Sequence, residues 1–229
     1  MRSRTYSVEG IVVRQFPLGE SDRIVIILTP TKGKIRVVGK GLRRLKSKLG
    51  GQLELLSQIR LTASIGRNLD IVTEAQTING HRALTQDLNK LSQAIYICEL
   101  LDAVTVEGLE IPNIYRLSAD VLNCLETAST PWLLVRHFEM RLLRELGFNP
   151  ELNQCVDCGS VLEAGDHLFK VSYGGIVCPC CSNNDRKTVV PVKLNGMKVL
   201  RALQRSEKLE ELDGIRISQE THRDVERLM

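Results

Sequence analysis

Two closely spaced pairs of cysteines constrain the fold of this 229-residue chain more than any other feature. Cys155 and Cys158 form one Cys-x-x-Cys pair, and Cys178 and Cys181 form a second, with 19 residues between the inner cysteines. Each such pair presents two thiolates from one tight turn, and four thiolates at this spacing are typical of a closed, tetrahedral zinc site. The sequence therefore predicts a small module, residues 152–185, that folds around one structural Zn²⁺.

Other chemistries for these cysteines stay open at this point. Cys180 is the alternative fourth ligand, and a redox dithiol or an iron–sulfur cluster are the alternatives to zinc. A deaminase-type catalytic zinc needs His-x-Glu followed by Pro-Cys-x-x-Cys. His137-Phe138-Glu139 occurs, but Gln154 stands where the proline belongs, and a fourth thiolate closes the position that a catalytic zinc keeps open. We therefore expect a structural metal and no enzyme.

The first third of the chain has the pattern of a small β-barrel. Short apolar runs alternate with turn sequences, and Pro30-Thr31-Lys32-Gly33 is suited to a hairpin. The predicted strands are Tyr6–Arg14, Arg23–Thr29, Lys34–Val38, Leu53–Leu61 and Leu69–Thr77. Five short strands in about 75 residues most economically form an oligonucleotide-binding (OB) fold, while an SH3-like barrel stays open.

After Gly80 the apolar residues recur at helical spacing. Thr130 and Pro131 are a typical start for one of these helices, and residues 193–206 and 218–229 are also expected to be helical. The predicted fold class is α+β. An OB-type barrel of five strands in residues 1–79 precedes an all-α domain, formed by residues 80–151 and 186–229, that carries the cysteine module as a zinc-ribbon-like insertion.

The barrel sequence contains a long stretch without carboxylates, between Asp22 and Glu54. Nine basic residues lie in this stretch: Arg23, Lys32, Lys34, Arg36, Lys40, Arg43, Arg44, Lys46 and Lys48. The last five stand among glycines and are expected on a mobile loop. The two-residue period of a strand places Lys34 and Arg36 on one face, from which they are expected to reach out. This arrangement predicts a site for a polyanion.

The distribution of charge favours nucleic acid as that polyanion. Residues 1–80 have 14 Lys and Arg against six Asp and Glu, a net charge of +8, whereas the remainder has a net charge of −4. No amphipathic basic helix, lipidation motif or apolar signal segment indicates a membrane, so a cytoplasmic location is expected. Tyr6 and Phe16 are the barrel's only aromatic residues, so binding should be directed mainly at phosphates, largely independent of sequence.

Several segments together resemble the bacterial recombination mediator family RecO. The segments that resemble its barrel are Glu9–Arg14, Gly19–Arg23, Leu28–Lys34 and Gly39–Ser47. Tyr96–Leu101 and Phe138–Phe148 are similar to its helical domain, and the cysteine pairs to its zinc module. The similarity runs through the whole chain in the same order.

The resemblance implies a non-enzymatic DNA-repair protein of the RecF pathway. Members bind single- and double-stranded DNA, anneal complementary strands, and act with RecR to load RecA on DNA covered by single-stranded-DNA-binding protein (SSB). It also implies a docking site for the acidic SSB tail on the helical domain, for which Arg136 and Arg141 are the candidate residues, and association with the nucleoid. The alternatives are an RNA-binding or translation-associated OB/zinc protein and a purely structural adaptor.

Overall fold

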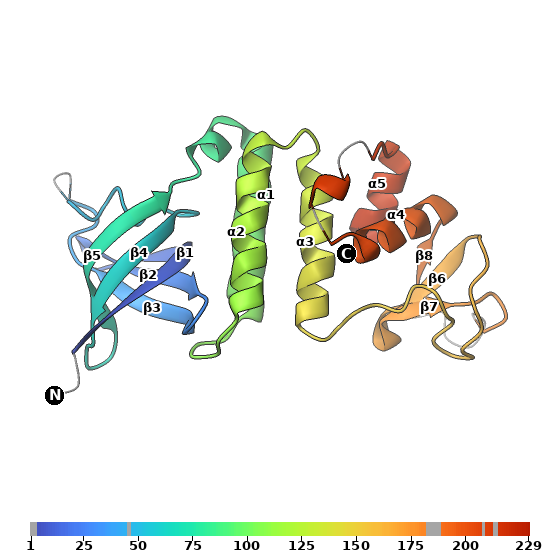
Figure 1. The fold of residues 1–229 in the computed structure, drawn as a ribbon, viewed down its shortest axis with the longest axis horizontal. Helices are drawn as coiled ribbons and strands as arrows, with labels where there is room; N and C mark the ends of the chain where they lie inside the picture. Colours follow the sequence, from blue (N-terminus) through green and yellow to red (C-terminus); the bar gives the residue numbers. More distant parts are fainter. Residues whose placement is uncertain (1–3, 45–46, 182–188, 208, 213–214) are drawn as a thin grey trace. The chain divides into compact units, whose positions relative to one another are not determined.

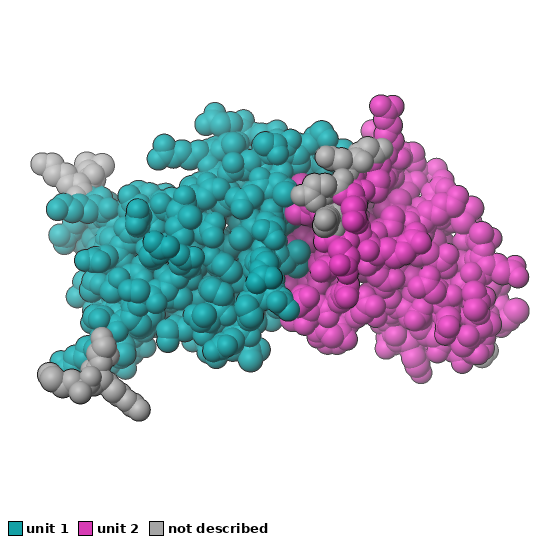
Figure 2. Space-filling model, viewed as in Figure 1, with its two compact units in different colours: residues 1–131 teal, residues 132–229 magenta. Residues whose placement is uncertain are grey.

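The computed structural model describes residues 4–44, 47–181, 189–207, 209–212 and 215–229 (Figure 1). The chain divides into two compact units, residues 1–131 and residues 132–229 (Figure 2). Lys46 and the predicted domain boundary between residues 185 and 186 lie outside the described residues. Within the described residues, no helix is long and apolar enough to cross a membrane.

The first unit begins with a closed barrel of five strands in the order β1-β2-β3-β5-β4. The strands are β1 (Thr5–Leu18), β2 (Asp22–Thr29), β3 (Gly33–Gly39), β4 (Gln58–Ser64) and β5 (Asp70–Asn79). All neighbouring strands are antiparallel except β3 and β5, which are parallel at Val37↔Asp70 and Val38↔Ile71. This is the strand order of an OB-fold, so the prediction of an OB-type barrel is confirmed.

Strand β1 closes the barrel because it pairs with two neighbours in turn. Its first half, from Thr5 to Ile11, lies against β4, and its second half, from Ile11 to Leu18, lies against β2. The register shifts between Val12 and Arg14, as at a β-bulge. A bulge bends a strand and increases its twist, which lets one strand serve both sides of a closed sheet.

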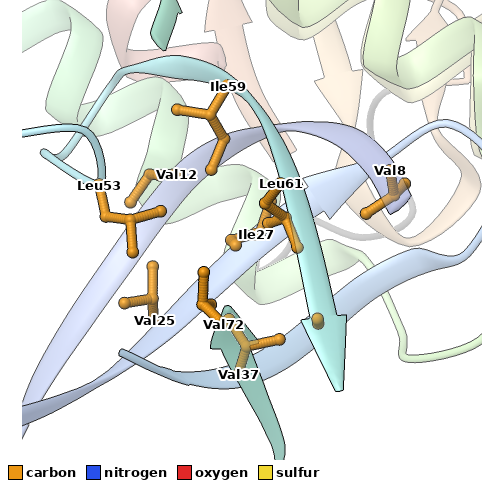
Figure 3. Close-up of a cluster of buried hydrophobic side chains, with 10 residues drawn as sticks. Val8, Val12, Val25, Ile27, Val37, Leu53, Ile59, Leu61 and Val72 are labelled. Carbon is orange, nitrogen blue, oxygen red and sulfur yellow. The ribbon is translucent and has the colours of Figure 1, made fainter. Parts of the chain in front are cut away.

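Alternate residues of the strands fill the barrel interior (Figure 3). The fully or nearly buried side chains of this core are Val8, Val12, Val25, Ile27, Val37, Leu53, Ile59, Leu61, Ala63 and Val72. The predicted strand Leu53–Leu61 is wrong in its first half, because β4 begins at Gln58. Leu53 and Leu56 are still buried, but they lie in the irregular segment before β4, where Leu53 packs into the barrel core and Leu56 has a φ of 72°.

Two helices of the first unit cover the outer face of the barrel (Figure 1). A 3-10 turn, η1 (Arg82–Gln86), leads into α1 (Leu88–Val104), which packs against β1, and α2 (Pro112–Thr127) contacts β2. Outward-facing residues of the hairpin are consequently buried, including Ile26, Leu28 and Lys34. In many OB-folds the face formed by strands 2 and 3 is the one that binds oligonucleotides.

The segment between α1 and α2 forms backbone hydrogen bonds with the start of β3, whose edge would otherwise be exposed. The Lys34 N–H donates to the Val106 carbonyl, and the Gly108 N–H donates to the Lys32 carbonyl, at 3.3 and 3.2 Å. Gly33, with a φ of 60°, lies so close that a Cβ there would be 2.1 Å from the Leu109 carbonyl oxygen. The backbone groups of Lys32 and Lys34, at the N-terminal end of β3, are therefore hydrogen-bonded and do not offer an edge to another strand.

The second unit contains the cysteine module and the remaining helices. Its helices are α3 (Pro131–Glu145), α4 (Leu194–Arg205) and α5 (Gln219–Leu228), with short 3-10 turns η2 (Val171–Tyr173) and η4 (Leu209–Leu212). Strands β6 (His167–Lys170), β7 (Gly175–Val177) and β8 (Val189–Val192) form a small sheet in the order β7-β6-β8. One apolar core joins this sheet to α4 and α5 through residues such as Ile176, Val192 and Leu200.

Candidate nucleic-acid interface and metal centre

Four basic side chains stand exposed on the loop that follows β3: Lys40, Arg43, Arg44 and Lys48. In the part of the chain that the structure describes, none of the four lies within 4.0 Å of a carboxylate. We call these four residues the loop cations. Their positive charge is therefore available to an external anion. The Asp22 carboxyl, which is near Lys40 and Arg44, accepts a hydrogen bond from the loop backbone.

The base of this loop is held against the turn between β1 and β2. The Gly41 N–H donates to Asp22 Oδ1 at 2.8 Å, and the Arg43 N–H donates to the Ser21 carbonyl at 3.0 Å. The hydrogen bond from Gly41 lowers the pKa of Asp22, helped by the nearby charges of Lys40 and Arg44. The sequence predicted a mobile loop, and its described first part, residues 40–44, is hydrogen-bonded to the β1–β2 turn.

Two basic residues of β3 do not reach out as expected. Lys34 is only 8% exposed, and its Nζ lies 3.1 Å from Asp102 Oδ1 of α1. Arg36 is half-exposed and its Nε lies 2.5 Å from Glu107 Oε1. Both side chains lie on the outer face, as the strand period predicted, but they are not free in solvent: α1 buries Lys34, and the segment after α1 supplies the carboxylate that pairs with Arg36.

The other two basic residues of the barrel have different surroundings. Arg23 is half-buried at the end of β2, where it donates to the Gln15 side chain at 2.5 Å. Lys32 is exposed at the β2–β3 turn, with its Nζ 4.8 Å from the centroid of the Tyr6 ring. The eight of these basic residues that the structure describes therefore do not form one surface, and the loop cations follow the opposite end of the hairpin from Lys32.

The sequence did not reveal the acidic residues that neutralise part of the barrel. Asp102 accepts from Arg14 at 2.9 Å as well as from Lys34, and Glu107 pairs with Arg36. These partners are 68 to 88 positions apart in sequence. Only the packing of α1 against the barrel brings them together, so no local pattern indicates the pairs.

The structure brings together the four cysteines of the predicted metal site. The Sγ atoms of Cys155, Cys158, Cys178 and Cys181 all lie within 4.8 Å of one another, and those of Cys158 and Cys178 are 3.8 Å apart. Four sulfurs bound tetrahedrally at a Zn–S distance of about 2.3 Å would be about 3.8 Å apart. Cys180 is exposed and is not a member of this group.

The backbone around the first pair is arranged to stabilise thiolates. Gly159, with a φ of 74°, closes a tight turn in which its N–H donates to the Cys155 carbonyl at 2.8 Å. The Cys178 N–H points at Cys155 Sγ, 3.3 Å away. Burial opposes ionisation of Cys155, but hydrogen bonds from backbone N–H groups, that of Cys178 first, outweigh it and lower its pKa.

The remaining thiols of the group influence one another. The Ser160 side chain and backbone lower the pKa of Cys158 to about 6, with the hydroxyl 3.1 Å from the sulfur. Contacts with the Cys178 and Cys158 thiols raise the pKa of Cys181 to about 12. Four sulfurs this close cannot all be anionic without a cation between them, so the donor set fits a divalent metal ion.

On helix α3 the structure separates the two arginines that were expected to bind a peptide tail. Arg136 is 9% exposed and its NH1 lies 3.0 Å from Glu139 Oε2, so its expected presentation at the surface is wrong. Arg141 is partly exposed, and its NH1 is 4.0 Å from Glu207 Oε1. The half-exposed Arg144 lies 3.8 Å from the same carboxylate.

Comparison with known proteins decides the family. The family descriptions "Recombination protein O N terminal" and "Recombination protein O C terminal" match residues 1–81 and 85–229. The chain belongs to the RecO family. DNA repair protein RecO of Roseiflexus sp. (strain RS-1) is 38% identical over 229 residues, which cover 100% of this chain and 80% of the relative.

Further RecO relatives agree with this assignment. DNA repair protein RecO of Dehalococcoides mccartyi (strain ATCC BAA-2266 / KCTC 15142 / 195) is 35% identical over 88% of this chain and 79% of its own length. That of Symbiobacterium thermophilum is 32% identical over 98% of this chain and 89% of its own length. Membership of the RecO family gives the chain a role in DNA repair and recombination.

Proposed function

We propose that the chain is a non-enzymatic recombination mediator that binds single- and double-stranded DNA and anneals complementary strands. The observation that carries this proposal is the group of loop cations, which are exposed, free of carboxylate partners within the described residues, and held at one end of an OB-fold barrel. Cations on a protein surface bind the phosphate backbone and displace its counterions.

Phosphate contacts suit a protein that anneals strands. They position the nucleic acid without reading its sequence, and they leave the hydrogen-bonding edges of the bases free to pair. Because helices α1 and α2 cover the outer face of β2 and β3, we place the DNA at the end of the barrel, along the loop cations, with Arg23 beside them. Lys32 and Arg36 would extend the path along the hairpin. Lys34 is left out, since its charge is buried against Asp102.

Four thiolates would hold one structural Zn²⁺ in the second unit. Cys155, Cys158, Cys178 and Cys181 would fill all four positions of a tetrahedral ion and leave none for a substrate. The ion would supply folding free energy to a module with a small core. Its site carries a net charge of about −2 with four thiolates, which disfavours it as the main DNA contact.

The proposed partners follow the family's role in the RecF pathway: RecR, the C-terminal tail of SSB and, indirectly, RecA. We propose that such mediators act in the cytoplasm, at the nucleoid. For the acidic SSB tail we favour Arg141 and Arg144, whose only carboxylate contact among the described residues is the exposed Glu207 at 4.0 and 3.8 Å. Arg136 is the weaker choice because it is buried beside Glu139.

The central experiment is a salt titration of DNA affinity. If about five residues contact phosphates, the log–log slope for a single strand should be about −3 to −4. The variant Lys40→Glu/Arg43→Glu/Arg44→Glu should bind all sequences more weakly, flatten this slope and lose strand annealing. The variant Lys198→Glu/Arg205→Glu/Arg223→Glu is a matched control, since it changes the net charge equally at exposed positions of the second unit.

Equal losses in the two variants would mean that net charge, and not the loop, governs binding. Competition between single-stranded DNA and RNA separates the proposal from an RNA-binding function. A fluorescence annealing assay on complementary oligonucleotides, with and without SSB, tests the mediator role directly. A structural adaptor would show no salt-dependent binding in any of these assays.

A further inference from the structure

The C-terminal end of β1 exposes two apolar side chains next to the loop cations. Phe16 is 36% exposed and Leu18 is 40% exposed. They are two positions apart on a strand and so lie on the same face, opposite to the barrel interior. Large apolar side chains at the surface of a charged barrel are a feature that phosphate binding alone does not use.

The Phe16 ring is held in place before any ligand arrives. The Arg14 guanidinium carbon lies 4.6 Å from the centroid of the ring, and Arg14 NH1 is itself bound to Asp102 Oδ2 at 2.9 Å. A cation over an aromatic face is attracted by the ring electrons. The guanidinium occupies one side of the ring, while the side chain as a whole is still more than a third exposed.

The same end of the barrel carries basic groups that we propose bind phosphate. Phe16, Pro17, Arg23 and Arg43 line one hollow of about 360 Å³. Arg43 is also tied to the turn that follows Leu18, since its NH1 donates to the Gly19 carbonyl at 3.4 Å and its N–H to the Ser21 carbonyl. An aromatic residue and two arginines around one hollow match the two chemical parts of a nucleotide, a flat base and an anionic phosphate.

We propose that Phe16, supported by Leu18, stacks against one unpaired base of single-stranded DNA whose phosphates lie on the loop cations. This inference rests on the proposed function and adds a base contact to it. Bases in a duplex are stacked on their neighbours and cannot take this position, so Phe16 favours single strands over duplexes. One stacked base leaves the rest of the strand free to pair, which is compatible with annealing.

The test compares oligothymidylate with an oligomer of abasic sites of the same length, which has the same phosphates but no bases. The wild-type protein should bind oligothymidylate at least about fivefold more tightly than the abasic oligomer, which corresponds to the smallest affinity gain expected from one stacked base. Phe16→Leu should abolish this difference without changing abasic affinity, salt slope or duplex affinity. Phe16→Tyr keeps an aromatic ring and should preserve the difference in affinity between the two oligomers. Phe148→Leu, at a 70% exposed phenylalanine of the second unit, should behave as wild type.

A spectroscopic readout is independent of affinity. Trp132 is the only tryptophan, so Phe16→Trp in a Trp132→Phe background places a single fluorophore at the site. Oligothymidylate should quench it, and the abasic oligomer should not. Two outcomes would overturn the base contact alone. In the first, Phe16→Leu still prefers oligothymidylate to the abasic oligomer; in the second, the wild type shows no such preference but still binds with a steep salt slope. Salt-independent binding, or none, would overturn the proposed function and the base contact together.

Discussion

The ammonium group of Lys34 lies 3.1 Å from the Asp102 carboxylate, and the two side chains are only 10% and 12% exposed. Arg14 approaches the other oxygen of the same carboxylate at 2.9 Å. One acidic residue of helix α1 therefore pairs with two basic residues of the barrel. The role of Lys34 follows from this arrangement: it joins the helix to the barrel and is not a contact for DNA.

Asp102→Asn should destabilise the first unit by roughly 1–3 kcal/mol, because Lys34 would keep a nearly buried charge without its counter-ion. Burial opposes ionisation of the Asp102 carboxyl, but hydrogen bonds from Arg14 and Lys34 outweigh it and lower its pKa. This stabilisation is present above the unfolded pKa of about 3.9 and is lost as the pH falls through the lower folded value. Denaturant unfolding at pH 7 and pH 3 measures both effects. The exposed Lys48→Met is the control, and equal stability of Asp102→Asn and wild type at pH 7 would contradict the assignment.

Glu107→Gln should strengthen DNA binding. The Glu107 carboxylate lies on Arg36, and both side chains are 53% exposed, so a phosphate can replace it. We expect the log–log salt slope for single strands to become steeper by about 0.7, the value for one additional phosphate contact. Glu110→Gln is a matched control on the same exposed segment. The same change in both variants would indicate a general effect of net charge.

Removal of the metal should unfold the cysteine module. Structural zinc contributes roughly 10–16 kcal/mol of apparent binding free energy in small modules. Cys155→Ser should therefore lose the bound metal and lower the melting temperature, whereas Cys180→Ser, outside the group of four thiols, should retain both. Metal analysis and thermal unfolding check this prediction. A metal-free preparation with full thermal stability is the outcome that rejects it.

The second unit should lose stability as the pH falls from 7 to 5. Burial lowers the pKa of His137, and the charge of Arg141 lowers it further. The hydrogen bond to the Ser206 carbonyl raises the pKa but does not outweigh these two effects. The imidazole is neutral when folded, with Nε2 donating to Ser206 at 3.1 Å. The contribution of the neutral imidazole to the free energy of unfolding is complete above the unfolded pKa of about 6.5. It is lost as the pH falls toward the lower pKa of the folded state. His137→Gln should reduce this dependence in urea titrations, and an unchanged dependence would exclude His137 as its source.

Local sequence patterns predicted the parts of this protein that depend on local chemistry. The hairpin at Pro30–Gly33 follows from a residue that fixes φ and one that takes a positive φ, and Gly33 has a φ of 60°. The four clustered thiols follow from the spacing of two tight turns. In both cases the sequence signal lies in short segments of a few adjacent residues, which a local pattern can detect.

Features that depend on packing could not be predicted in the same way. Lys34 has the strand period of an outward residue, yet the approach of α1 buries it. Leu53 and Leu56 have the composition of a strand but precede β4, and Leu53 packs into the barrel core from outside the strands. Arg136 has the appearance of a surface arginine, and its burial beside Glu139 depends on tertiary packing.

The completion of the β3 edge by residues 105–111 has a consequence for synthesis on the ribosome. The last strand of the barrel ends at Asn79, but the groups that pair with Lys32 and Lys34 follow almost thirty residues later. During translation the barrel therefore passes through a stage in which all its strands have emerged while one edge and the apolar outer face of β2 remain open. The nascent chain therefore cannot complete its first unit until the segment after α1 has left the exit tunnel, although the match to the N-terminal family description ends at residue 81.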